Sequence, residues 1–141
     1  MDKYQFPQTS QHKDMVEIAS EDLADFMRNM FGQYAVQLEQ AHFKLLESMS
    51  PDYKGGQWKA YTNHKSVFFM VPPKGDYRIM VAGNGFDCVM SEQAAGLVTS
   101  IVAINKLLWR TYDKQHDKMF KALRRYAQNH KESAAIMSAI D

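Results

Sequence analysis

The stretch that decides the fold is residues 67–90, VFFMVPPKGDYRIMVAGNGFDCVM. It opens with a continuous apolar run at 67–71, rich in β formers, which predicts a strand buried on both faces. Apolar and polar residues then alternate over 77–82 and again over 86–90. This period of two is typical of half-buried strands. The stretch therefore predicts three consecutive strands.

The segments between these runs are short and have turn chemistry. Residues 72–76 read PPKGD, and Asn84-Gly85 is the strongest short-range hairpin signal, because both residues tolerate positive φ. Turns of this length cannot supply the crossover that parallel strands need. Residues 57–62 add a further candidate strand. We therefore expect an antiparallel meander of three or four strands.

Helical spacing of apolar side chains flanks the meander on both sides. Ser20 is predicted as the N-cap of the first helix and Gly32 as its end. The stretch 94–108 is apolar almost all round, which fits a buried core helix better than a membrane span, because polar residues interrupt it. The other predicted helices are 34–49, 91–110 (which contains that stretch), 114–129 and 132–139.

These patterns predict an α+β protein with an antiparallel three- to four-stranded meander packed against several helices. A chain of 141 residues suits a single domain, which we place at residues 20–141. Residues 1–19 are polar and weakly patterned and are expected to form a poorly ordered N-terminal arm, although Met15, Val16 and Ile18 could anchor it.

The charge balance excludes some classes of protein. There are 17 Lys and Arg against 16 Asp and Glu, a net charge of +1, with a pI of about 7.8. Nucleic-acid-binding domains typically have a pI above about 9. The charge is uneven: residues 1–50 carry −4, residues 51–90 carry +2, and residues 91–141 carry +3. With no signal peptide and no membrane span predicted, we expect a cytoplasmic protein without membrane contact.

No catalytic, cofactor or metal site is predicted. Cys88 is the only cysteine, which excludes a disulfide framework, and it is expected to pack as a small hydrophobe. The five histidines lack metal-ligand spacing, and no GxSxG occurs. Gly55-Gly56 is not followed by a P-loop ending or a helix, so it is no phosphate cradle.

Two features allow a binding and a structural interpretation. Basic residues step along one face of the predicted helix 114–129, and could touch phosphate or an acidic partner, but are more simply a solvated face. Trp58 and Tyr61 could stack on bases, but no basic run is interleaved with them, so core packing is the better interpretation, at least for Trp58. Trp58 is therefore predicted to be buried.

Four ordered segments resemble the ArdB/KlcA family of antirestriction proteins. They are the glycine–aromatic motif of Gly55, Gly56, Trp58, Tyr61 and Thr62; the FMxP stretch at 69–72; the motif of Met90, Ser91, Ala94, Ala95 and Gly96 within MSEQAAGL; and the C-terminal 123–141. The resemblance covers roughly residues 30–141.

This resemblance implies a small α+β protein carried by plasmids, phages or genomic islands. Such proteins protect incoming unmodified DNA from type I restriction enzymes, so the implied partner is the type I restriction-modification complex, reached directly or indirectly. The resemblance supplies no catalytic residues and no cofactor, and we expect a non-enzymatic inhibitor.

Duplex DNA carries one negative charge per about 1.7 Å. Imitation of that field by a chain of net charge +1 is therefore excluded, and tight DNA binding is not expected. The alternatives are a weakly nucleic-acid-binding accessory protein of a mobile element and, last, an enzyme with an unrecognised site. The candidate interaction residues are Lys54, Asn84, Lys114, Lys118, Lys121, Arg125 and Asp141.

Overall fold

The computed structural model describes residues 15–63 and 67–141. The predicted helices and strands are all present, and their bounds differ from the predicted ones by two residues or fewer. In chain order the elements are β1 (Val16–Ile18), α1 (Ser20–Phe31), the 3-10 helix η2 (Gly32–Tyr34), α2 (Ala35–Met49), β2 (Lys59–Thr62), β3 (Phe68–Val71), β4 (Asp76–Val81), β5 (Phe86–Ser91), α3 (Glu92–Thr111), α4 (Lys114–Gln128) and α5 (Ser133–Ile140).

The strands form two antiparallel sheets. One has the order β1-β2-β3 and the other is the hairpin β4-β5. The α+β class and the antiparallel pairing are confirmed, but the meander does not run through one sheet, because β3 and β4 do not pair. Pro72 and Pro73 offer no backbone N–H for a ladder. The carbonyl of Pro73 accepts a hydrogen bond from the Tyr77 hydroxyl at 2.6 Å.

The hairpin predicted from Asn84-Gly85 is present, but its turn differs from the expected one. Val81 pairs with Phe86, which leaves a loop of residues 82–85. Gly85 has a φ of 74°, whereas Asn84 is not among the residues with positive φ. The Gly85 N–H donates to the Val81 carbonyl at 3.0 Å. A two-residue turn would need positive φ at both Asn84 and Gly85, whereas this four-residue loop needs it only at Gly85.

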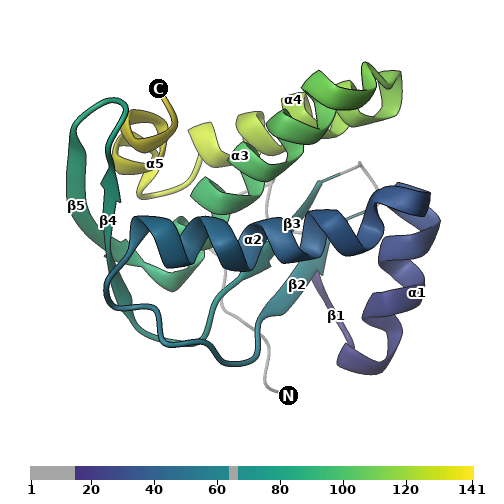
Figure 1. Ribbon diagram of the computed structural model, residues 1–141, viewed down its shortest axis with the longest axis horizontal. Coiled ribbons are helices and arrows are strands. Elements are labelled where there is room, and N and C mark those ends of the chain that lie inside the picture. The colour runs from purple at the N-terminus through teal and green to yellow at the C-terminus, as the bar shows by residue number, and fades with distance from the viewer. Residues whose placement is uncertain (1–14, 64–66) are drawn as a thin grey trace.

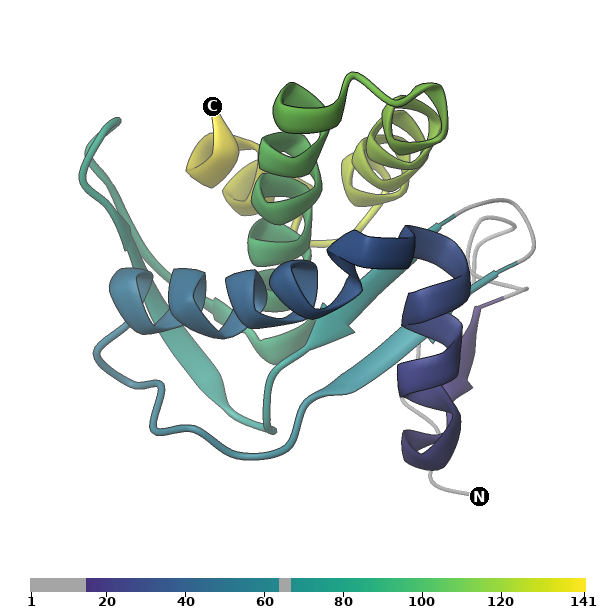
Figure 2. The same ribbon diagram turned by 45° about the vertical axis from the view of Figure 1, so that its right-hand side comes forward.

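Helix α3 lies at the centre of the molecule. Figure 2 shows α2 crossing in front of it, α4 and α5 on either side, and the β4–β5 hairpin rising on the left. Ala94, Ala95 and Leu97 are fully buried. The predicted core helix and its packing against the strands are confirmed (Figure 1). No helix in the described ranges is both long enough and apolar enough to span a membrane.

The predicted N-terminal arm is partly described. Met15 is buried, and Val16–Ile18 pair with β2 as strand β1, so residues 16–18 are held in a sheet. The apolar residues of the arm thus anchor it, as the sequence allowed. For residues 16–18 the expectation of poor order is wrong. Residues 1–14 of the arm lie outside the described residues. Ser20 is the first residue of α1 and not its cap, because Ala19 occupies the N-cap position.

The expectation that Cys88 packs as a small hydrophobe is wrong. Its side chain is exposed, although its cross-strand partner Ile79 is fully buried. The middle residues of β5, 87–89, are all exposed, so other elements leave this part of the hairpin uncovered. Position in the sheet, which alternation alone does not give, decides the exposure of Cys88.

Candidate interaction surface

The glycine–aromatic motif closes the loop between α2 and β2. Gly55 and Gly56 have φ values of 83° and 118°, and a Cβ on Gly56 would lie 2.7 Å from Cγ of Pro73. Trp58 is 6% exposed, and its indole N–H donates to the Tyr53 hydroxyl at 3.0 Å. The predicted burial of Trp58 is confirmed. The motif fixes a tight backbone path beside a buried tryptophan.

The end of the same motif strengthens the β2–β3 pair. Tyr61 is buried and its ring stacks on that of Phe69, with centroids 5.7 Å apart. The Thr62 hydroxyl donates to the Val67 carbonyl at 2.9 Å. Neither Trp58 nor Tyr61 therefore presents a ring for base stacking.

The motif at 90–97 joins α3 to the C-terminal segment. Ser91 caps α3, its Oγ accepting from the Ala94 N–H at 3.2 Å. The Ser91 N–H donates to Oε1 of Glu132 at 3.0 Å, and the Ser91 hydroxyl donates to the other carboxylate oxygen. Two residues further on, the Gln93 amide oxygen accepts from the His130 ring. Met90, which precedes the cap, is buried.

Gly96 sets the approach of α3 to the three-stranded sheet. A Cβ at this position would lie 2.2 Å from the carbonyl oxygen of Met70 and 3.0 Å from Cα of Val71. Only glycine lets helix and strand come this close. The FMxP stretch and the motif at 90–97 thus form one helix–strand contact.

Asn84 and Asp141 lie together at the hairpin tip. The Asn84 side-chain amide donates to the carbonyls of Ser138, Ala139 and Asp141 at 3.2, 3.1 and 2.9 Å. Asn84 therefore caps the C-terminal end of α5, which otherwise leaves carbonyls without partners. This side chain has a structural role that the sequence did not indicate.

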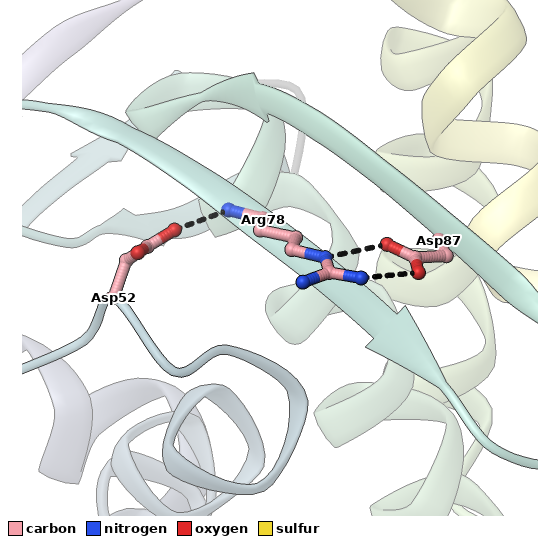
Figure 3. Close-up of polar contacts among 3 residues, drawn as sticks. All are labelled: Asp52, Arg78 and Asp87. Atoms are coloured by element: carbon pink, nitrogen blue, oxygen red, sulfur yellow. Dashed lines mark hydrogen bonds and ion pairs between the residues drawn. The ribbon is translucent and has the colours of Figure 1, made fainter.

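An arginine fork links the two strands of the hairpin, and the backbone of the same residue ties β4 to the loop after α2 (Figure 3). The Arg78 guanidinium makes two hydrogen bonds to the Asp87 carboxylate, at 2.8 and 2.7 Å, and the Arg78 backbone N–H donates to Asp52 at 2.8 Å. The side-chain hydrogen bond raises the pKa of Arg78 and lowers the pKa of Asp87. Both carboxylates are thus engaged within the molecule.

The predicted basic face of α4 is exposed. Lys114, Lys118, Lys121 and Arg125 all point outward, and Lys121 forms an ion pair with Asp117 at 2.9 Å. The opposite face is buried and consists of His116, Met119, Leu123, Tyr126 and Ala127. Exposure agrees with both the solvated-face and the binding interpretation, because it leaves the surface accessible to a partner.

A buried histidine–serine pair was missed by sequence reasoning. The His42 Nδ1–H donates to the Leu38 carbonyl at 2.8 Å, so Nε2 accepts from the Ser100 hydroxyl at 3.1 Å. Ser100 Oγ also accepts from the Met70 N–H at 3.0 Å. Burial lowers the pKa of His42 to about 4. The pair is 58 residues apart in the chain, so only the tertiary fold reveals it.

The geometry of this pair is that of a nucleophile and its base, but no substrate can reach it. His42 and Ser100 are 1% and 2% exposed, and the adjoining cavity has a volume of about 10 Å³, about enough for one water molecule. The pair instead joins α2, α3 and β3. The described residues contain no cluster of His, Cys, Asp and Glu that could hold a metal ion.

The family assignment follows from comparison with known proteins. The model of a family described as "Antirestriction protein" matches residues 51–141, which include all four segments quoted from the sequence. The chain belongs to the antirestriction protein family.

Individual members of the family match nearly the whole chain. Antirestriction protein KlcA of Escherichia coli is 35% identical over 133 residues, which cover 88% of this chain and 90% of KlcA. The putative antirestriction protein YubI of Escherichia coli K12 is 27% identical over 127 residues, covering 85% and 90%. The ArdB/KlcA resemblance is confirmed.

A solved structure from this family has the same fold. It matches with a TM-score of 0.80 and 26% identity and covers 99% of each chain. The KlcA and ArdB proteins of that study showed a novel fold and antirestriction activity against type I DNA restriction systems in vivo but not in vitro.

The antirestriction fold spreads the predicted interaction residues over three places. Lys54 is exposed in the loop between α2 and β2, Asn84 and Asp141 meet beside α5, and the basic face belongs to α4 (Figure 1). The structure therefore brings Asn84 and Asp141 together and keeps the four basic residues on α4, but it does not join the three places into one surface.

Proposed function

We propose that this protein inhibits type I restriction-modification systems in the cell and so protects incoming unmodified mobile DNA. The observation that carries the proposal is the match over 99% of the chain to a structure whose family members act against type I systems in vivo. The family assignment at residues 51–141 supports it independently. The proposed place of action is the cytoplasm, where restriction enzymes meet entering DNA.

The charge distribution argues against acidic DNA mimicry. The net charge is +1, and duplex DNA would require one negative charge per about 1.7 Å. Several carboxylates are engaged internally: Asp87 with Arg78, Asp52 with a backbone N–H, and Glu132 with Ser91. Inhibition by shape-specific contact, or by an indirect route, is the alternative that this surface supports.

A non-enzymatic mechanism is part of the proposal. Two hydroxyl–imidazole pairs occur in the described residues: His42 with Ser100, in which both side chains are buried, and His116 with Thr111, in which the imidazole is buried. The motif residues from Gly55 to Gly96 close turns, cap α3 and set a helix–strand contact, which supports structural roles for them. No cofactor is required by this mechanism.

The test is phage plating on cells with an active type I system, with and without the protein. We expect unmodified phage to plate more efficiently when the protein is present. Modified phage should plate equally in both cultures, and a type II system should be unaffected. Unchanged plating across several type I systems, with the protein folded and expressed, would contradict the proposal.

A weakly nucleic-acid-binding accessory protein is the second candidate, because the basic face of α4 is exposed. A gel shift with duplex DNA at increasing salt separates the two. Binding that persists at physiological salt and falls steeply with added salt would favour this candidate. Under the leading proposal the purified protein shows no tight binding.

A further inference from the structure

We propose that the corner between α3 and α4 is a docking site for the acidic surface of a protein partner. The site consists of an aromatic pair, Trp109 and Tyr112, flanked by Lys106, Arg110, Lys114 and Lys118. It rests on the proposed function, because the partner is a protein of the restriction system or one on which restriction depends. In Figure 2 this corner lies at the top of the molecule, away from the β4–β5 hairpin.

Two large aromatic side chains are exposed at this corner. Trp109 is 64% exposed and Tyr112 is 74% exposed, and in the described residues they are the only aromatic side chains among the exposed large hydrophobics. Their rings meet edge to face, with centroids 6.2 Å apart and an interplanar angle of 82°. Each ring supports the other, so the pair forms a preorganised apolar feature that has no role in the core.

The backbone at Tyr112 is held in a conformation that glycine would normally occupy. Its φ is 52°, and it is the only non-glycine residue with positive φ in the part of the chain that the structure describes. Tyr112 ends α3, its N–H donating to the Leu108 carbonyl at 2.8 Å. Glycine or asparagine is usual at such an end. Because most of the ring is exposed, core packing does not account for a tyrosine here, and strain of this kind clusters at functional sites.

The surroundings of the pair are basic, and the basic residues continue along α4. Residues 106–118 contain four Lys and Arg against two Asp, and residues 105–128 contain seven against two, whereas the whole chain has a net charge of only +1. Both aspartates are engaged: Asp113 accepts from two backbone N–H groups of α4, and Asp117 pairs with Lys121. Arg110 is held by a hydrogen bond to Gln37 at 2.8 Å. This local field attracts an acidic surface.

The composition and geometry favour a protein over a nucleic acid. Trp, Tyr and Arg are the residues most enriched at the energetic centres of protein interfaces. Single strands bind by stacking successive bases on aromatic rings, and two rings at 82° cannot both stack on neighbouring bases. The remainder of the chain has a net charge of −4, so a nucleic acid extending beyond the corner would meet repulsion.

Substitutions at the corner separate binding from folding. Tyr112→Gly removes the ring and places the preferred residue at the left-handed position, so its thermal midpoint should equal or exceed that of the wild type. We expect Tyr112→Gly and Trp109→Ser each to reduce phage protection by at least about tenfold, the effect expected of a central interface residue. Val89→Ser is the matched control, because Val89 is also 64% exposed but lies on β5.

A position-specific cross-link tests the occupant directly. A photoreactive side chain at position 109, and at position 89 as control, is activated in restricting cells. We expect a nuclease-resistant adduct with a second protein from position 109 only, lost when Tyr112→Gly is added. That protein, once purified, should bind the Lys118→Glu variant at least about tenfold more weakly than the Lys44→Glu variant, because Lys44 lies on α2.

The outcomes distinguish this inference from the proposed function. A nuclease-sensitive adduct, an adduct of two copies of this chain, or no adduct would overturn the docking site. Equal phage protection by the wild type and Tyr112→Gly would overturn it as well. If the wild type fails to protect phage but the purified second protein shows the expected charge dependence, the proposed function fails and the docking site stands.

Discussion

Gly96 is the residue at which α3 comes closest to the three-stranded sheet. A Cβ there would lie 2.2 Å from the Met70 carbonyl oxygen, a backbone atom that cannot move without shifting β3. We expect Gly96→Ala to lower the free energy of unfolding by about 1–3 kcal/mol, the usual cost of overpacking. Urea denaturation measures the change.

Gly83→Ala is the matched control for this substitution. Nothing lies within 4 Å of a Cβ built on Gly83, and its φ is not in the left-handed region. Its denaturation midpoint should stay close to that of the wild type. Equal midpoints for the two variants would show that the contact at Gly96 is looser than the structure indicates.

Single residues were predicted from the sequence where chemistry decides their position. Trp58 was correctly placed in the core, since a large aromatic beside two glycines has an apolar surface to bury. The exposure of Cys88 was not predicted, because alternation along a strand does not say which part of the hairpin other elements cover. The pairing of His42 with Ser100 depends on the packing of α2 against α3, which a sequence pattern does not encode.

Helix α5 depends on a side chain from another element. The Asn84 amide on the hairpin loop donates to three carbonyls at the end of α5. Asn84→Ala should cost about 1 kcal/mol of stability, as the loss of a helix cap or a buried hydrogen bond does. Hydrogen exchange should quicken at the amides of α5 while those of α4 stay protected.

Asn29→Ala, an exposed substitution on α1, serves as the control for Asn84→Ala. It should leave exchange in α5 unchanged. If hydrogen exchange in α5 is unaltered in the Asn84→Ala variant, water replaces the three hydrogen bonds without loss of stability.

The sequence predicted the helices and strands better than it predicted the contacts between them. Periodicity located every helix and strand outside β1 and η2, because the period of apolar residues follows directly from backbone geometry. The division into two sheets was not predicted, since it depends on how Pro72 and Pro73 redirect the chain after β3. The exposed pair Trp109 and Tyr112 was also missed, because a tryptophan at the end of an apolar helix has the same pattern as a core residue.

Stability of the whole molecule should depend on pH through His42. Burial lowers the pKa of this histidine to about 4, against 6.5 for the unperturbed side chain. Above pH 6.5 it is neutral in both states and stability is unaffected. Between pH 6.5 and about 4 the unfolded chain binds a proton that the folded protein does not, so stability falls as pH falls. The loss levels off below pH 4 at about 3 kcal/mol.

The measurement compares urea denaturation of the wild type and His42→Gln at pH 7.5 and 4.5. Glutamine does not titrate, so the variant should lose less stability between the two pH values, even if it is less stable at both. The carboxylates titrate alike in both proteins and cancel in the comparison. If the free energy of unfolding falls equally in the two proteins, His42 binds its proton in the folded protein as readily as in the unfolded chain.

Helix α3 takes its partners from segments far away along the chain on both sides. Ser91 at its start bonds to Glu132, 41 residues later, and Ser100 bonds to His42, 58 residues earlier. Each such contact closes a long loop, and the entropy of closing it must be overcome before the contact contributes any stability. The chain should therefore fold more slowly than a helical bundle of similar size, whose contacts are mostly local.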